Sequence, residues 1–199
     1  MEIEKRIFGI EFRQQNGSVN QKIIGMAACF NIRSATLRTI DGQEFQEELA
    51  LGAFKDALTQ NDCRSLINHN PDKILGRSSA GTLLLQETEN GLAFEIDPPD
   101  TSYARDLKIS MARKDVKECS FAFSVAPGGD SWTRDEKTKM PIRTIRQIGK
   151  LYDVSVVTYP AYDSTQCSLR SIGKLKAEEI PTFNDTEIRK MKLQIESII

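Results

Sequence analysis

Hydrophobic and polar residues alternate over many short stretches of the chain, a pattern typical of β-strands. The clearest stretch is 117–125, which a Pro-Gly-Gly turn signal follows. Successive side chains of a strand point to opposite faces. One face is apolar, is expected to lie against a core, and carries Cys119, Phe121, Phe123 and Val125. The other face is small and partly polar, and it carries Ser120, Ala122 and Ser124.

The same alternation predicts about nine strands in total. The other strands are expected over residues 5–14, 22–32, 64–69, 73–77, 82–87, 92–97, 142–148 and 151–158. Asn90 and Gly91 are typical of a hairpin turn. Asn70 and Pro71 are expected to stop the strand before them, and Gly149 to separate the last two strands. Residues 126–141 are predicted to form a mobile loop or a long hairpin.

Two helices are predicted between the strands, over residues 52–58 and from about 102 to 114. The second helix places Ala104, Leu107 and Met111 on one face. The order β-rich, helix, β-rich differs from the alternation of strands and helices that builds a parallel sheet. We therefore expect a mainly β fold with flanking helices, an antiparallel β-barrel or a sandwich.

The composition changes after residue 170, which predicts three parts. Residues 1–170 are expected to form the folded domain, 171–183 a charged linker and 184–199 an amphipathic helix. The apolar positions of this helix are Ile188, Met191, Ile195 and Ile198, at spacings of three and four. A single helix of this length is marginally stable alone, so it either docks on the domain or meets a partner helix.

Composition and charge exclude several classes of function. The chain has 199 residues, 39% of them hydrophobic and 28% charged, as expected for one globular domain with a tail. The net charge of −1 gives no basic field for nucleic acid. No apolar run approaches the length of a membrane span or a signal peptide. The four cysteines and one histidine have no metal-ligand or disulfide spacing, so no cofactor or metal is expected.

Three residues are candidates for hydrolytic chemistry. Ser120 presents a hydroxyl on a strand with small neighbours, although it could be an outward polar residue of an amphipathic strand. His69, the only histidine, is the one imidazole that could activate it as a general base, or it is a histidine without a chemical role. Asp153 stands isolated in an apolar strand, where it either orients the imidazole or faces water at a sheet edge.

Cys119 is the competing nucleophile, because a thiolate is intrinsically stronger than a hydroxyl. The alternation places it on the Phe121 and Phe123 face, where a thiol is buried and inert. Ser120 is therefore preferred. Backbone amides from the loop after its strand are candidates for stabilising an oxyanion.

Three ordered segments resemble the motifs of tailed-phage prohead maturation proteases. Residues 66–77 resemble the histidine motif, 118–123 the serine motif and 151–162 the third motif, which has an acid at the place of Asp153. The likeness covers roughly residues 5–170. This family is related in fold to the herpesvirus assembly proteases, which have a second histidine as third member. This chain has no second histidine, so only His69 and Ser120 transfer directly.

The resemblance implies a herpesvirus-protease-like β-barrel ringed by helices and a serine endopeptidase. Such enzymes act inside the immature capsid in the host cytoplasm, where the major capsid protein and the scaffold are their substrates. A homodimer is a possibility that the related fold suggests. The alternatives are a non-catalytic capsid assembly protein that docks scaffold, and a small-molecule esterase or amidase.

Overall fold

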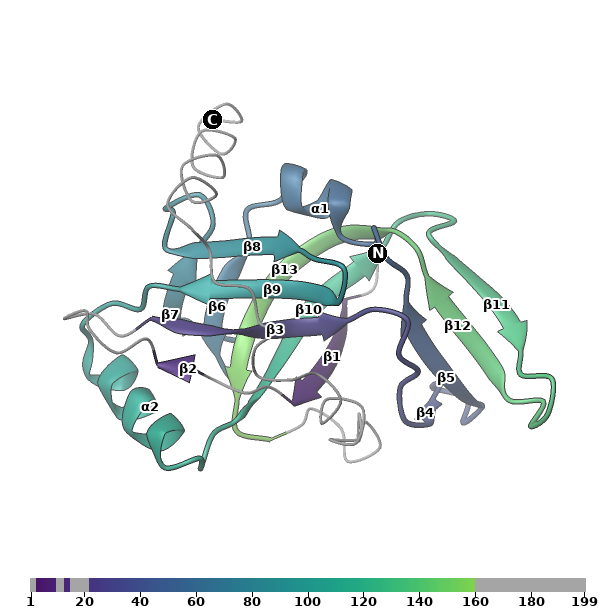
Figure 1. The fold of residues 1–199 in the computed structure, drawn as a ribbon, viewed down its shortest axis with the longest axis horizontal. Coiled ribbons are helices and arrows are strands. Elements are labelled where there is room, and N and C mark those ends of the chain that lie inside the picture. The colour runs from purple at the N-terminus through teal and green to yellow at the C-terminus, as the bar shows by residue number, and fades with distance from the viewer. Residues whose placement is uncertain (1–2, 10–12, 15–21, 160–199) are drawn as a thin grey trace.

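The computed structural model describes residues 3–9, 13–14 and 22–159. This part of the chain forms three β-sheets and two helices (Figure 1). The predicted linker 171–183 and the predicted helix 184–199 lie outside the described residues.

The first sheet has five strands and the other two have four each. The five-stranded sheet contains, in spatial order, β1 (Glu4–Gly9), β10 (Glu118–Val125), β13 (Ile148–Val157), β6 (Arg64–Ile67) and β7 (Asn70–Arg77). The second sheet contains β11 (Asp130–Arg134), β12 (Pro141–Ile145), β5 (Glu44–Leu49) and β4 (Leu37–Arg38). The third contains β2 (Arg13–Gln14), β3 (Ile23–Cys29), β9 (Gly91–Ile96) and β8 (Leu83–Glu87). The helices are α1 (Lys55–Gln60) and α2 (Ser102–Ala112).

The mainly β composition with few helices agrees with the prediction, but the closed antiparallel barrel does not. Within the described ranges the strand ladders are three separate sheets. Two strand pairs are parallel, β13 with β6 and β12 with β5. The alternation of side chains reports which face of a strand is buried, and it does not report which neighbour the strand pairs with. The two strands of each parallel pair are far apart in the sequence, so no local pattern indicates that they pair.

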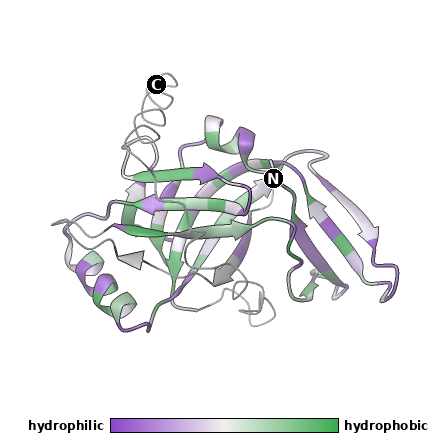
Figure 2. Ribbon diagram, viewed as in Figure 1, coloured by the Kyte–Doolittle hydropathy of each residue, from purple (hydrophilic) through white to green (hydrophobic). Residues whose placement is uncertain are grey.

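The core lies where the third sheet covers one face of the five-stranded sheet, and the strands there are predominantly apolar (Figure 2). Phe121 and Phe123 of β10 stack with ring centroids 4.9 Å apart. Phe54, just before α1, meets Phe121 edge-on at 5.6 Å. Each aromatic pair of this geometry contributes about 1 kcal/mol of stability beyond that from the apolar surface it buries. The apolar face predicted for residues 117–125 is thus the centre of the core.

Helix α2 begins and ends close to its predicted bounds, and its buried residues are Ala104, Leu107 and Met111. The hydroxyl of Tyr103 donates to the backbone carbonyl of Ile74 at 2.9 Å, which ties this helix to β7. Residues 126–141 contain β11 and the first residue of β12, so the hairpin alternative describes them.

Two glycines have roles that differ from the predicted ones. Asn90 and Gly91 do follow β8 and precede most of β9, and the two strands pair as a hairpin. Gly91 itself lies in β9, where a Cβ atom would be 1.9 Å from the carbonyl oxygen of Ala28. Gly149 lies inside β13 rather than between two strands, and its absent side chain gives room to the backbone of Ala126. Both glycines permit close approach of two backbones.

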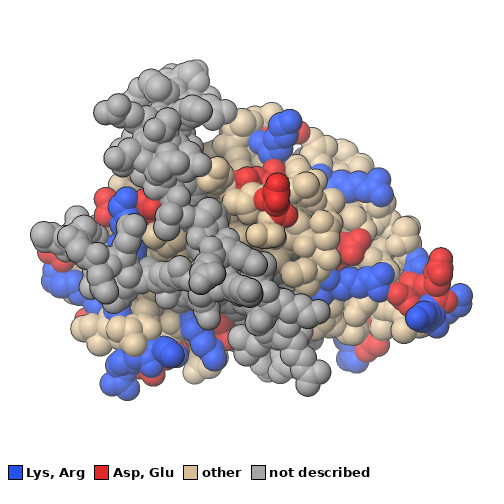
Figure 3. Space-filling model, in the orientation of Figure 1, with Lys and Arg blue, Asp and Glu red and all other residues tan. Residues whose placement is uncertain are grey.

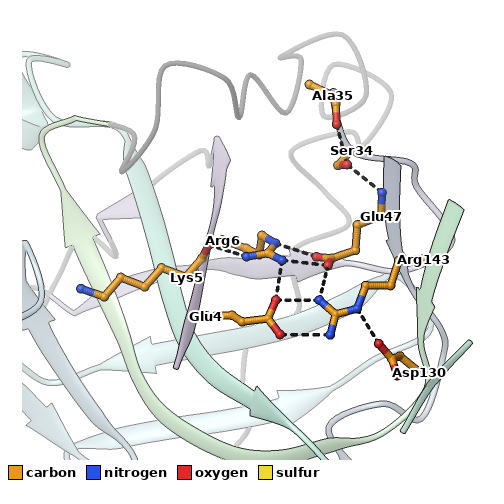
Figure 4. Close-up of polar contacts among 8 residues, drawn as sticks. All are labelled: Glu4, Lys5, Arg6, Ser34, Ala35, Glu47, Asp130 and Arg143. Atoms are coloured by element: carbon orange, nitrogen blue, oxygen red, sulfur yellow. Dashed lines mark hydrogen bonds and ion pairs between the residues drawn. The ribbon is translucent and has the colours of Figure 1, made fainter. Parts of the chain in front are cut away.

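A cluster of five charged side chains joins β1 to the second sheet (Figure 4). Arg6 of β1 donates to both carboxylate oxygens of Glu47 on β5, at 2.6 and 2.8 Å. Arg143 of β12 donates to both oxygens of Glu4 on β1, at 2.7 and 3.0 Å, and also contacts Glu47 and Asp130. Glu47 is 4% exposed. We call these five residues, Glu4, Arg6, Glu47, Asp130 and Arg143, the charged cluster.

Arg143→Ala should destabilise the protein by about 3 kcal/mol, because it leaves buried carboxylates without one of their two cations. Urea unfolding measures the change. Arg38→Ala is the matched control, since Arg38 pairs with Glu44 at an exposed position, where the two side chains are 66% and 45% accessible. Loss of that pair should change the free energy of unfolding by less than about 1 kcal/mol. Equal effects of the two substitutions would show that the charged cluster does not stabilise the fold.

The charged cluster should also make stability depend on pH. Burial alone would raise the pKa of Glu4, but the hydrogen bonds and charges of Arg143 and Arg6 outweigh burial and hold this pKa below its usual value. Such a group stabilises the folded state above its unfolded pKa of about 4.3, and the stabilisation is lost as the pH falls. Unfolding free energies from pH 7 to pH 3 should therefore decrease less steeply for Glu4→Gln than for the wild type.

Candidate active site

The pairing of β10 with β13 places the predicted serine and aspartate side by side. Ser120 lies opposite Ser155, and Ala122 lies opposite Asp153. Residues directly opposite in an antiparallel pair share a face of the sheet. Ser120, Asp153 and Ser155 therefore share the face that points away from the Phe121 core. Both faces of β10 are buried, and Ser120 has no solvent exposure.

His69 reaches this face from a tight turn between β6 and β7. Asn68 and His69 are the two residues of the turn, and both have positive φ, 54° and 55°. Positive φ at both central positions is the hallmark of the type I′ hairpin turn, and Asn and His tolerate that region better than most residues. The expected stop at Asn70 and Pro71 was therefore wrong, because these residues begin β7. The strand ends two residues earlier, where the backbone reverses.

Asn68 attaches the turn to the end of β13. Its backbone amide donates to the Val156 carbonyl at 2.8 Å. Its side-chain Oδ1 accepts from the amide of Thr158 at 2.8 Å, and its Nδ2 donates to the Thr158 hydroxyl at 2.8 Å. The turn that carries His69 is thus held to the strand that carries Asp153.

His69 bridges the other two candidates. Its Nδ1 lies 2.7 Å from Oδ1 of Asp153, and its Nε2 lies 2.8 Å from Oγ of Ser120. An ionised carboxylate only accepts hydrogen bonds, so Nδ1 carries the proton. In the neutral ring Nε2 is then the acceptor for the Ser120 hydroxyl. The side chains of His69 and Asp153 are 9% and 11% exposed, so water screens these contacts little.

The competing nucleophile lies on the opposite face of β10. Cys119 is fully buried in the core, and its Sγ is 3.7 Å from the Met26 carbonyl oxygen. Burial raises the pKa of this thiol well above its usual value, which keeps it neutral. Two backbone amides of the loop after β10, where oxyanion donors were expected, already have partners within the protein. The amides of Ala126 and Gly129 donate to backbone carbonyls of the protein.

Two polar residues around the site were not assigned a role from the sequence. Ser155 shares a face with Asp153 by simple alternation, and its Oγ donates to Oδ1 of Asp153. The sequence places it there but does not reveal this contact. Asn68 immediately precedes His69, and only the observed turn explains why an asparagine suits that position.

The described residues show no group of three or more His, Cys, Asp or Glu side chains placed to hold a metal ion. None of the helices in the described ranges is long and apolar enough to cross a membrane. Basic and acidic side chains are interspersed over the face seen in Figure 3.

A serine hydroxyl, an imidazole and a carboxylate in this order of contact form the arrangement of a serine protease. The chain matches the caudovirus prohead serine protease family over residues 9–178. It belongs to that family and is a serine protease of the prohead type. No curated protein matches the chain. Among solved structures it is similar to the capsid assembly protease of bacteriophage T4, with 10% identity, a TM-score of 0.47, and coverage of 80% of this chain and 98% of that one.

Asn68→Ala should destabilise the protein by about 1–3 kcal/mol, because it removes the side-chain bonds to Thr158 and places an unfavourable residue at positive φ. Asn68→Gly should be milder, since glycine adopts this conformation freely. Thermal unfolding compares the two. Asn31→Gly is the control, because Asn31 also has φ of 55° and lies far from the site in sequence. If the two substitutions at Asn68 were equally mild, the attachment would not hold the turn.

Proposed function

We propose that Ser120 is the nucleophile, His69 the general base and Asp153 the residue that orients the imidazole. The observation that supports this assignment is the position of His69, whose two ring nitrogens contact Ser120 and Asp153 separately. An imidazole held between a hydroxyl and a carboxylate can take up and return one proton without moving.

The reaction proceeds by acyl transfer. Ser120 Oγ attacks the peptide carbonyl carbon while His69 Nε2 takes the hydroxyl proton, which gives a tetrahedral intermediate and an imidazolium. The imidazolium donates that proton to the leaving amine as the C–N bond breaks, and an acyl-serine ester remains. Water then attacks the ester while His69 again acts as base. The ester bond breaks, the carboxylic acid product leaves, and His69 returns the proton to restore the Ser120 hydroxyl.

Asp153 supports this cycle through charge and tautomer. It accepts from Nδ1, so Nε2 faces Ser120 in its basic form. Its negative charge stabilises the imidazolium that forms in each half of the reaction.

The substrates we propose are the major capsid protein and the scaffold of the same phage. Membership of the prohead serine protease family supports this choice. The enzyme would act inside the immature capsid, in the cytoplasm of the infected host, on chains held close to it at high effective concentration. Cleavage would then depend on assembly as well as on recognition of the peptide.

Ser120→Ala and His69→Ala should each lower kcat by about 10⁴- to 10⁶-fold, because residues of such a site act as a unit. Asp153→Asn should lower it less than either, since the nucleophile and the base both remain. Intact mass spectrometry of capsid and scaffold proteins incubated with each variant measures cleavage and maps the cut sites. A fluorophosphonate probe should label the wild type at Ser120.

Ser124→Ala is the control, because Ser124 is equally buried on the same strand and face. It should retain cleavage and labelling. If Ser120→Ala cleaved its substrates as fast as the wild type, the assignment would be overturned, and Cys119 would be the next candidate nucleophile. Absence of fragments with every form, free or in assembled shells, would favour the non-catalytic assembly protein.

A further inference from the structure

We propose that Ser155 is a positioning residue that keeps Asp153 ionised and oriented toward His69. Ser155 is fully buried on β13, two residues after Asp153 and directly opposite Ser120. This inference rests on the proposed function, because it gives Ser155 a role in the same site.

The Asp153 carboxylate has two hydrogen-bond donors that converge on one oxygen. Oδ1 accepts from Ser155 Oγ and lies 2.7 Å from His69 Nδ1. A buried carboxylate is costly unless donors stabilise its charge, and each donor to the ionised form favours that form. Ser155 also fixes the carboxylate rotation, since a strand residue two positions away has a nearly invariant place on the same face.

The charged and titratable groups beside Asp153 on the β6 side do not replace this donor. Arg64 lies opposite Asp153 in the parallel pairing with β6, but its guanidinium contacts Asp62 instead. Cys63 precedes β6, and burial together with the negative charge of Asp153 raises the pKa of its thiol. A neutral thiol adds no positive charge near the carboxylate. The hydroxyl of Ser155 therefore complements His69 in stabilising the anion.

Removal of this hydroxyl has a defined electrostatic consequence. Without Ser155 Oγ, the carboxylate is less stabilised as an anion, so the His69–Asp153 pair binds a proton more readily. The acidic limb of the kcat/KM profile should move to higher pH, since the protonated pair cannot act as a base. A purely structural role for Ser155 would lower activity without moving this limb.

The first test uses the full chain and a double-mutant cycle. Ser155→Ala should lower kcat/KM by about 10- to 100-fold, the range for losing a hydrogen bond to a charged group. In an Asp153→Asn background the same substitution should change kcat/KM by less than about 2-fold, because its effect passes through the carboxylate. Ser65→Ala is the control. Ser65 is fully buried on β6, and its Oγ has no hydrogen bond in the described part of the chain.

The second test does not depend on activity. The chain contains one histidine, so a two-bond ¹H–¹⁵N spectrum shows a single imidazole that needs no assignment. The midpoint of its titration should be higher in Ser155→Ala than in the wild type and unchanged in Ser65→Ala. Ser155→Cys has similar volume and a weak S–H donor, so it should give a smaller shift in the same direction.

The outcomes separate the two proposals. An unmoved histidine midpoint in both Ser155 variants, or an equal loss of activity in the Asp153→Asn background, would overturn the role of Ser155. A wild type without peptidase activity would overturn the proposed function, while the titration would still decide whether Ser155 acts on the His69–Asp153 pair.

Discussion

The antiparallel register between β10 and β13 is the constraint on which the site depends. It sets Ser120 opposite Ser155, and it sets Asp153 opposite Ala122, the next residue on the same face of β10. A slip of one residue would turn every side chain of β10 to the other face. Phe121 and Phe123 would then leave the core, where each is fully buried, and removal of one such ring costs about 3–5 kcal/mol. The hydrophobic face of β10 therefore holds the polar face in place. The geometry of the site depends on side chains that pack on the opposite face of the strand.

The histidine is positioned by a different means, because it stands on a turn and not on a strand. Positive φ at a residue other than glycine costs of order 1–2 kcal/mol, and the β6–β7 turn has two such residues in succession. The bonds from Asn68 to Val156 and Thr158 stabilise this conformation from the end of β13. One of these two residues is His69, which approaches both Ser120 and Asp153, and backbone strain is commonly found at functional sites.

Local patterns in the sequence predicted most of what lies on single strands. The alternation of residues 117–125 separated Ser120 from Cys119, and the isolated acid in residues 151–158 identified Asp153 as a candidate. The turn at Asn68 and His69 was missed because the Asn-Pro pair that follows gives a stronger turn signal than an Asn-His pair. The two parallel strand pairings were not predicted, for another reason. Parallel partners such as β6 and β13 lie far apart in the sequence. Their pairing therefore depends on tertiary packing, which the local alternation of apolar and polar residues does not report.

The charged cluster has the longest reach in sequence, since Arg143 pairs with Glu4 across 139 residues. A buried ion-pair network is weak evidence for net stability, because desolvation offsets much of the attraction. Its clearer consequence is geometric, because Glu4 and Arg6 both belong to β1, the strand that pairs with the other side of β10. With β1 in place, β10 has hydrogen-bonded neighbours on both sides and is not a sheet edge, where backbone groups would be unpaired and mobile. The backbone of Ser120 is thus fixed by β13 on one side and, through β1, by charges on a second sheet.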